Sequence, residues 1–266
     1  MDNSSNKKLK KSHSNKKIVL ITVILSLFLI TAILFFLFCN FTSLGYNASA
    51  AMGMHGFYKL SDNIYIDKDF KGNSEFLLSN IDKAKERVSD FFGDYYYDPK
   101  IIITDDPQKI QKLSGDHDTK SFTVLGFRAY VHLSPGFASD INIVAHELTH
   151  AQTHYLVFHD KIIGRFQVHL PAWFDEGIAM QNDHRAYYND DAWNNLTDNG
   201  KDVFDITSIK DRDFYSSNNN EQNDHYILAR YEVQQWINEN GRDALVNLLN
   251  DLNSGKNFDD IYFNDK

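Results

Sequence analysis

His146-Glu147-Leu148-Thr149-His150 is the stretch on which the interpretation of this chain depends. It lies within a pattern that predicts a helix from about residue 139 to residue 158. Side chains four positions apart lie on one face of a helix, so both imidazoles can reach one metal ion. Glu147 lies one step round the helix, where its carboxylate can contact a water on that metal. The pentad therefore predicts a Zn²⁺ site with two histidine ligands and a carboxylate base.

The composition of the chain shows how readily such a pentad arises by chance. The sequence contains 11 His and 7 Glu among 266 residues. At these frequencies about 0.01 H-E-x-x-H matches are expected by chance in the whole chain. The alternative is an ordinary amphipathic helix whose polar His and Glu side chains lie on a solvated face. Further ligands are needed to separate the two interpretations.

Length and charge limit the class of protein. A chain of 266 residues fits one sizeable domain or two small ones, and 42% apolar and 14% aromatic content is typical of a globular protein. The net charge of −9 is uneven, because residues 1–17 hold six Lys and one Asp while the remainder is strongly acidic. Acidic domains bind nucleic acid poorly, so we expect no nucleic-acid partner.

An uncharged apolar run of 21 residues occupies positions 18–38. It is long enough to cross a bilayer as a helix, and the Lys-rich residues before it favour the cytoplasm. We therefore expect a single-pass cell-membrane protein whose larger part is extracytoplasmic. A cleaved signal peptide is an alternative, although its apolar core would be shorter and the possible cleavage site at 48–50 is distant. A lipoprotein anchored at Cys39 is another, but Phe38 stands where a small residue is expected.

The expected organisation has four parts: a cytoplasmic basic tail (1–17), a transmembrane signal-anchor helix (18–38), a small, polar, Gly-rich linker (39–56) and a globular domain (57–266). Cys39 is the only cysteine, so the outer domain has no intrachain disulfide. Strand patterns precede most of the helical patterns, which favours the α+β class with a small N-terminal sheet and a helical C-terminal part. The expected strands are 63–67, 100–104 and 122–134 with a turn or bulge at Gly126, and the expected helices are 74–92, 107–113, 139–158, one opened by Pro171, 224–238 and 243–252.

The pentad requires a third ligand, since a catalytic zinc usually has three protein ligands and one water. His154 follows His150 by four residues, but three ligands at successive four-residue steps would spread too far along the axis, at about 6 Å a step. We therefore expect His154 behind the ligands or at the surface. The segment 171–179, PAWFDEGIA, offers Glu176, and Asp175 is expected to face a different side of that helix. The alternative for Glu176 is a first-turn residue that interacts with the helix dipole.

With Glu176 the chain resembles the gluzincin metallopeptidases, which combine an H-E-x-x-H helix with a glutamate in a W-x-x-E-G-x-A pattern on the next helix. Over roughly residues 75–260 it is most similar to the peptidase-MA-like family. Two further segments are similar at the level of pattern: a C-terminal helix pair and the strand at 129–134, which is placed like the cleft edge strand of that family. That strand could bind an extended peptide at a sheet edge, and its alternative is a plain core strand. The resemblance implies a zincin-like fold with Zn²⁺ on His146, His150 and Glu176, and Glu147 as general base.

The resemblance also implies an oxyanion donor and has two departures. Tyr226 is the candidate donor, with simple packing as its alternative and His225 as another donor. The aminopeptidase segment Gly-x-Met-Glu-Asn is absent, since residues 125–129 read LGFRA, which favours an endopeptidase. Position 180 is Met rather than Asp, so the acid that orients a zinc-bound histidine is unassigned; Asp183 and Asp140 are candidates.

The functional expectation is a membrane-anchored, outward-facing zinc endopeptidase with a peptide or protein substrate. The alternative is a catalytically inactive zincin-fold binding or adhesion domain at the cell surface. Glu147 argues against that alternative, because binding alone does not need a base. An intramembrane protease is excluded because the pentad lies more than 100 residues beyond the apolar run.

Overall fold

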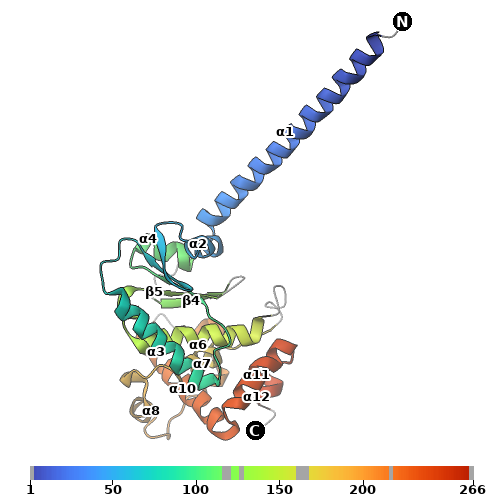
Figure 1. Cartoon of the computed structure of the whole chain (residues 1–266). Coiled ribbons are helices and arrows are strands. Elements are labelled where there is room, and N and C mark those ends of the chain that lie inside the picture. The colour runs from blue at the N-terminus through green and yellow to red at the C-terminus, as the bar shows by residue number, and fades with distance from the viewer. Residues whose placement is uncertain (1–2, 116–120, 126–128, 160–167, 216–217, 264–266) are drawn as a thin grey trace.

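The computed structural model describes residues 3–115, 121–125, 129–159, 168–215 and 218–263. They form a mixed α+β structure that is mostly helical, with one five-stranded sheet and a long helix at the N-terminus (Figure 1). The predicted α+β class is therefore confirmed. Gly126, predicted as a turn or bulge, lies outside the described residues.

The sheet has the strand order β1-β2-β3-β5-β4. β2 pairs with β3 and β3 with β5 in parallel, whereas β1–β2 and β4–β5 are antiparallel. β5 therefore lies inside the sheet, so the alternative of a core strand for residues 129–134 is confirmed and the edge-strand expectation was wrong; β4 forms that edge. The bounds are β1 (Phe57–Ser61), β2 (Ile64–Asp67), β3 (Lys100–Ile103), β4 (Ser121–Leu125) and β5 (Ala129–Leu133).

Both faces of the sheet are buried because its central strands alternate between two apolar sets. One face is aliphatic and belongs to the main core, and the other is largely aromatic and belongs to a second, smaller core. The aliphatic set is Ile64, Ile66, Ile101, Ile103, Val131 and Leu133, and the second set is Phe57, Tyr65, Ile102 and Tyr130. A strand buried on both faces reads as a continuous apolar run, as 100–104 does.

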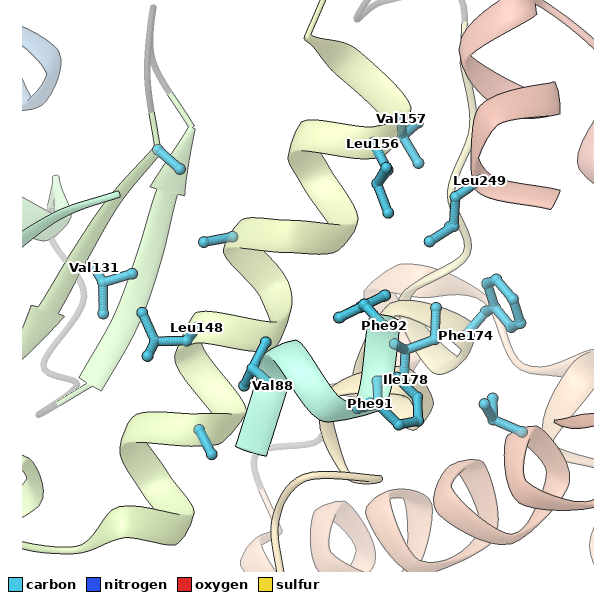
Figure 2. Packing of buried hydrophobic residues seen from close by; sticks show 14 of the residues in the cluster. Val88, Phe91, Phe92, Val131, Leu148, Leu156, Val157, Phe174, Ile178 and Leu249 are labelled. Carbon is cyan, nitrogen blue, oxygen red and sulfur yellow. The ribbon is translucent and has the colours of Figure 1, made fainter. Parts of the chain in front are cut away.

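Two helices cover the aliphatic face: α3 (Ser74–Phe92) and α6 (Ile141–Phe158). Leu148 of α6 points toward Val131 of β5, and Val88 of α3 lies close by (Figure 2). The predicted helix 74–92 is confirmed, although Asn73 rather than Ser74 caps it by accepting a hydrogen bond from Phe76 N–H at 3.0 Å. This packing fixes the position of the pentad helix beneath the sheet.

The C-terminal part is helical. After the short α5 (Pro135–Ala138), it comprises α7 (Ala172–Ala179), α8 (Asp190–Leu196), α9 (Asp211–Phe214), α10 (Asn219–Asn240), α11 (Arg242–Ser254) and α12 (Phe258–Tyr262). α7 packs against α10 so closely that a Cβ on Gly177 would lie 2.5 Å from Val233 Cγ2 and 2.6 Å from the Ala229 carbonyl oxygen. Only glycine fits there without a shift, and this contact places the neighbouring Glu176.

The N-terminal helix α1 (Asn3–Phe41) includes the stretch Val19–Phe41, which by length and composition is apolar enough to cross a membrane. It leaves the domain as a long rod beside α2 (Ser43–Ala50) (Figure 1). Cys39, at the end of α1, is buried.

The segment expected as a linker, 39–56, is largely helical and packed. Tyr46 and Ala50 of α2 lie in the smaller core against the aromatic face of the sheet. Asn47 Nδ2 donates a hydrogen bond of 2.7 Å to the carbonyl of Leu113, at the end of α4 (Pro107–Ser114). Residues 48–50, the possible cleavage site, belong to α2. Small polar residues here permit close helix packing rather than flexibility.

Candidate metal centre

The pentad helix brings the two imidazoles of His146 and His150 together. Their Nε2 atoms are 3.2 Å apart, and the two rings meet edge to face at 78°. His150 is buried and His146 is half-buried. The spacing of four residues within one regular helix produces this arrangement.

Glu176 approaches the same point from α7. Its Oε2 lies 3.3 Å from His146 Nε2 and 3.4 Å from His150 Nε2. This oxygen is buried and makes no hydrogen bond among the described residues. One ligand atom from each of the three residues falls within 4.8 Å of the others, so the group is arranged to hold a metal ion.

The electrostatics of these groups reflect their mutual attraction. Burial alone would lower the pKa of His150, but the charges of Asp175 and Glu176 raise it well above its usual value. Burial also works to raise the pKa of Glu176, yet the imidazoles, His150 foremost, lower it to about 2. The carboxylate is therefore ionised, and the site favours a positive charge between its three ligand atoms.

Glu147 lies beside this group and contacts the edge strand β4. The hydroxyl of Thr123 donates to Glu147 Oε2 at 3.0 Å and also lies 3.1 Å from the Glu147 carbonyl oxygen. The side chain of Glu147 is largely buried and lines the same cavity as His146 and His150. Thr123 thus anchors one carboxylate oxygen of Glu147 and leaves the other available.

Other polar groups lie behind the candidate ligands. Asp175 does not face away from the site as expected, because its Oδ2 lies 3.1 Å from His150 Nδ1 and 2.8 Å from His154 Nε2. Asp183, one of the two acids considered for orienting a histidine, places Oδ2 3.7 Å from His146 Nδ1. Asp140, the other, caps the start of α6 by accepting from Asn142 N–H at 2.9 Å.

A cavity of about 600 Å³ opens in front of the three candidate ligands. The edge strand β4 forms one wall through Phe122, Thr123 and Val124. Three tyrosines contribute to the lining: Tyr188, Tyr215 and Tyr226. The cavity is therefore bounded by the edge strand β4 and by phenol side chains, a lining that suits an extended polar chain.

Two tyrosines and one histidine near the cavity are candidates for hydrogen bonding to a substrate, and each has a different hydrogen-bond partner in the protein. Tyr226 lines the cavity, its hydroxyl accepts from Gln222 Nε2 at 3.1 Å, and burial raises its pKa. His225 places Nδ1 2.8 Å from the Phe214 carbonyl, which favours a structural role. Tyr215, which sequence reasoning missed, donates to Glu176 Oε1 at 2.9 Å. It lies in an Asn- and Asp-rich stretch without periodicity, so no sequence signal marked it.

Comparisons of the chain with models of protein families, with curated proteins and with solved structures give no match. The interpretation of this centre therefore depends on its geometry and on the chemistry of its residues.

Proposed function

We propose that the chain is a zinc-dependent peptidase in which His146, His150 and Glu176 hold Zn²⁺. The observation that carries the proposal is the convergence of these three side chains at the floor of a cavity, with Glu147 beside them. Two imidazoles and one carboxylate are a common ligand set of catalytic zinc. The buried oxygen Glu176 Oε2, which has no hydrogen bond among the described residues, is the kind of atom that a metal ion satisfies.

Bound Zn²⁺ supplies a Lewis acid that lowers the pKa of a coordinated water toward about 7. The protein's own contribution to hydrolysis is then proton transfer. Glu147 accepts the proton of the attacking water on its free oxygen Oε1, since Oε2 is held by Thr123. It passes that proton to the leaving amine as the C–N bond breaks. Tyr226 is the candidate donor to the oxygen of the attacked carbonyl, because its hydroxyl lines the cavity.

The substrate class follows from the cavity wall. β4 is an edge strand, and an extended peptide can pair with such an edge through main-chain hydrogen bonds. The cavity lies along this strand, so a peptide there would run past Glu147. We therefore retain peptide-bond hydrolysis, with an endopeptidase as the preferred form, and assign the binding strand to β4 instead of β5.

The apolar helix suggests where the enzyme works. The stretch Val19–Phe41 has the length to span a membrane, and Lys-rich residues precede it. We propose a single-pass anchor with the N-terminus in the cytoplasm and the peptidase domain outside the cell membrane.

The metal part of the proposal is tested by zinc content. We expect the full chain, purified in detergent with zinc supplied, to bind one equivalent of Zn²⁺ and His146→Ala to lose it. Full-length protein that binds no zinc under these conditions contradicts the proposed function.

The catalytic part is tested with Glu147→Gln, which keeps the shape of the side chain but removes the base. We expect Glu147→Gln to retain zinc and to lose peptide hydrolysis, measured as a proteome-wide cleavage profile against the wild type. Wild-type protein that binds zinc but cleaves no more peptides than Glu147→Gln does would favour a binding or adhesion domain.

A further inference from the structure

His150 contacts two carboxylates from opposite ring nitrogens. Its Nε2 faces Glu176 Oε2 at 3.4 Å, whereas its Nδ1 faces Asp175 Oδ2 at 3.1 Å. A neutral imidazole has one acceptor nitrogen and one N–H donor. A metal ion on Nε2 therefore requires the proton on Nδ1, where Asp175 is the adjacent acceptor. Asp175 and Glu176, which are adjacent on α7, therefore contact the two nitrogens of the His150 ring.

Asp175 is held in turn by His154. The same oxygen, Oδ2, lies 2.8 Å from His154 Nε2, which is shorter than its separation from His150. Both side chains are mostly buried, at 13% and 14% exposure. The rings of His150 and His154 are successive on α6, with centroids 5.8 Å apart, so Asp175 bridges one helical turn. Among the described residues His150 Nδ1 has no hydrogen bond of its own, whereas Asp175 Oδ2 is bonded to His154, so His154 is the side chain that restrains Asp175.

The other histidine of the site is supported less closely. His146 Nδ1 is 3.7 Å from Asp183 Oδ2, which is too long for a hydrogen bond. Asp183 is engaged by Arg185, whose Nε donates to Oδ1 at 2.8 Å. The carboxylate behind His150 therefore has a dedicated histidine, whereas the carboxylate behind His146 is neutralised by an arginine.

We propose that His154 is a positioning residue that holds Asp175 against Nδ1 of His150 and so orients the zinc-facing nitrogen. The inference depends on the proposed metal site and assigns a role to a residue outside it. Orienting carboxylates of this kind affect metal affinity by about 10–100-fold. His150, His154 and Asp175 also form a second group that could hold a cation. A cation bound there would take the lone pair of His150 Nδ1, which faces Asp175. A neutral imidazole that holds zinc on Nε2 carries its proton on Nδ1, so a neutral His150 cannot serve both sites.

Zinc affinity, measured by chelator competition on the full chain in detergent, tests the proposal. His154→Leu removes the donor to Asp175, and we expect affinity to fall roughly 3- to 10-fold, the equivalent of one hydrogen bond. His154→Gln keeps an N–H donor at similar reach and should restore affinity to within about twofold. Asp175→Asn should lose 10- to 100-fold. The matched control is His169→Leu, because His169 Nε2 lies 3.0 Å from Asp211 Oδ2 in an exposed pair.

Two further readouts separate positioning from general stability. The unfolding midpoint of the metal-free His154→Leu protein should equal that of His154→Gln, and its Co²⁺ absorption spectrum should shift from that of the wild type. Zinc affinity of His154→Leu equal to the wild type overturns the inference. Two equivalents of zinc in the wild type that fall to one in His154→Leu also overturn it, in favour of a second metal ion. Wild-type protein without zinc would instead overturn the proposed function on which the inference depends.

Discussion

The two faces of the sheet are covered in different ways. The aliphatic face packs against α3 and α6, two long helices of 19 and 18 residues with a broad shared core. The aromatic face packs against α2, a helix of only 8 residues that continues from the apolar rod α1. Figure 1 shows α2 and α4 on one side of the sheet and α3 and α6 on the other. The candidate metal centre lies on the side of the long helices.

The difference shows that the domain begins before its first strand. Tyr46 and Ala50 of α2 lie among the side chains of the aromatic face, and hydrogen bonds from Ser43 and Asn47 to the Leu113 carbonyl attach α2 to α4. Those contacts bury the apolar side chains of the aromatic face. The end of the molecule from which the apolar helix α1 leaves is therefore part of the folded domain.

Removing α2 should have the largest effect on the stability of the domain. A fragment of residues 57–266 lacks the cover of the aromatic face and exposes Tyr65, Ile102 and Tyr130. We expect it to lose roughly 5 kcal/mol or more, which is the whole stability of many domains. A fragment of residues 42–266 keeps α2 and its cap Thr42 and should fold cooperatively. Circular dichroism during heating measures both, and equal midpoints would show that α2 is dispensable.

Two buried glycines test the two faces separately. Gly177→Ala places a Cβ 2.5 Å from Val233 Cγ2, and Gly45→Ala places one 2.1 Å from the Phe38 carbonyl oxygen. Each should cost about 1–3 kcal/mol through overpacking. Only Gly177→Ala displaces α7, so only this substitution should also weaken zinc binding.

Gly136→Ala is the matched control for both substitutions, because a Cβ there has nothing within 4 Å. It should change the free energy of unfolding by less than about 0.5 kcal/mol. Weaker zinc binding in Gly45→Ala than in Gly177→Ala would contradict the separation of the two faces. Denaturant unfolding and chelator competition provide the two measurements.

Acid should destabilise the aromatic face through His132. This side chain is fully buried in β5 and stacks on Phe122 at 4.5 Å, and burial lowers its pKa to about 3. The unfolded value is near 6.5, so the unfolded chain binds more protons between pH 6.5 and pH 3. The contribution of this group to the free energy of unfolding is complete above pH 6.5 and decreases as the pH falls toward 3. At pH 5 the decrease is about 2 kcal/mol.

The measurement is denaturant unfolding of chelator-treated protein at pH 7 and pH 5, so that metal release does not contribute. His132→Leu should lack this part of the pH dependence while the remaining titrating groups are unchanged. An identical loss of stability in the wild type and in His132→Leu would show that His132 does not carry it.

The sequence predicted the helices of the aliphatic face better than the cover of the aromatic face. Regular apolar spacing predicted α3 and α6, and the fixed four-residue step of a helix brought His146 and His150 together without tertiary information. The cover of the aromatic face was missed because Gly45, Ser49 and Ala50 are small, and small residues pack closely without an apolar period. The contacts of Asp175 were also missed, since a reach across to another helix depends on how α7 crosses α6.

The smallest expected effect on zinc binding distinguishes two tyrosines of the cavity. Tyr215 donates to Glu176 Oε1 at 2.9 Å, whereas Tyr226 is bonded to Gln222. Tyr215→Phe removes one hydrogen bond, worth about 0.5–1.5 kcal/mol, and should weaken zinc binding by up to roughly tenfold. Tyr226→Phe should leave zinc affinity unchanged and lower turnover by about 10²-fold, as the loss of an oxyanion donor does. The opposite pattern would exchange the two roles, because a phenol that holds a ligand acts on affinity and a phenol that meets the reacting carbonyl acts on rate.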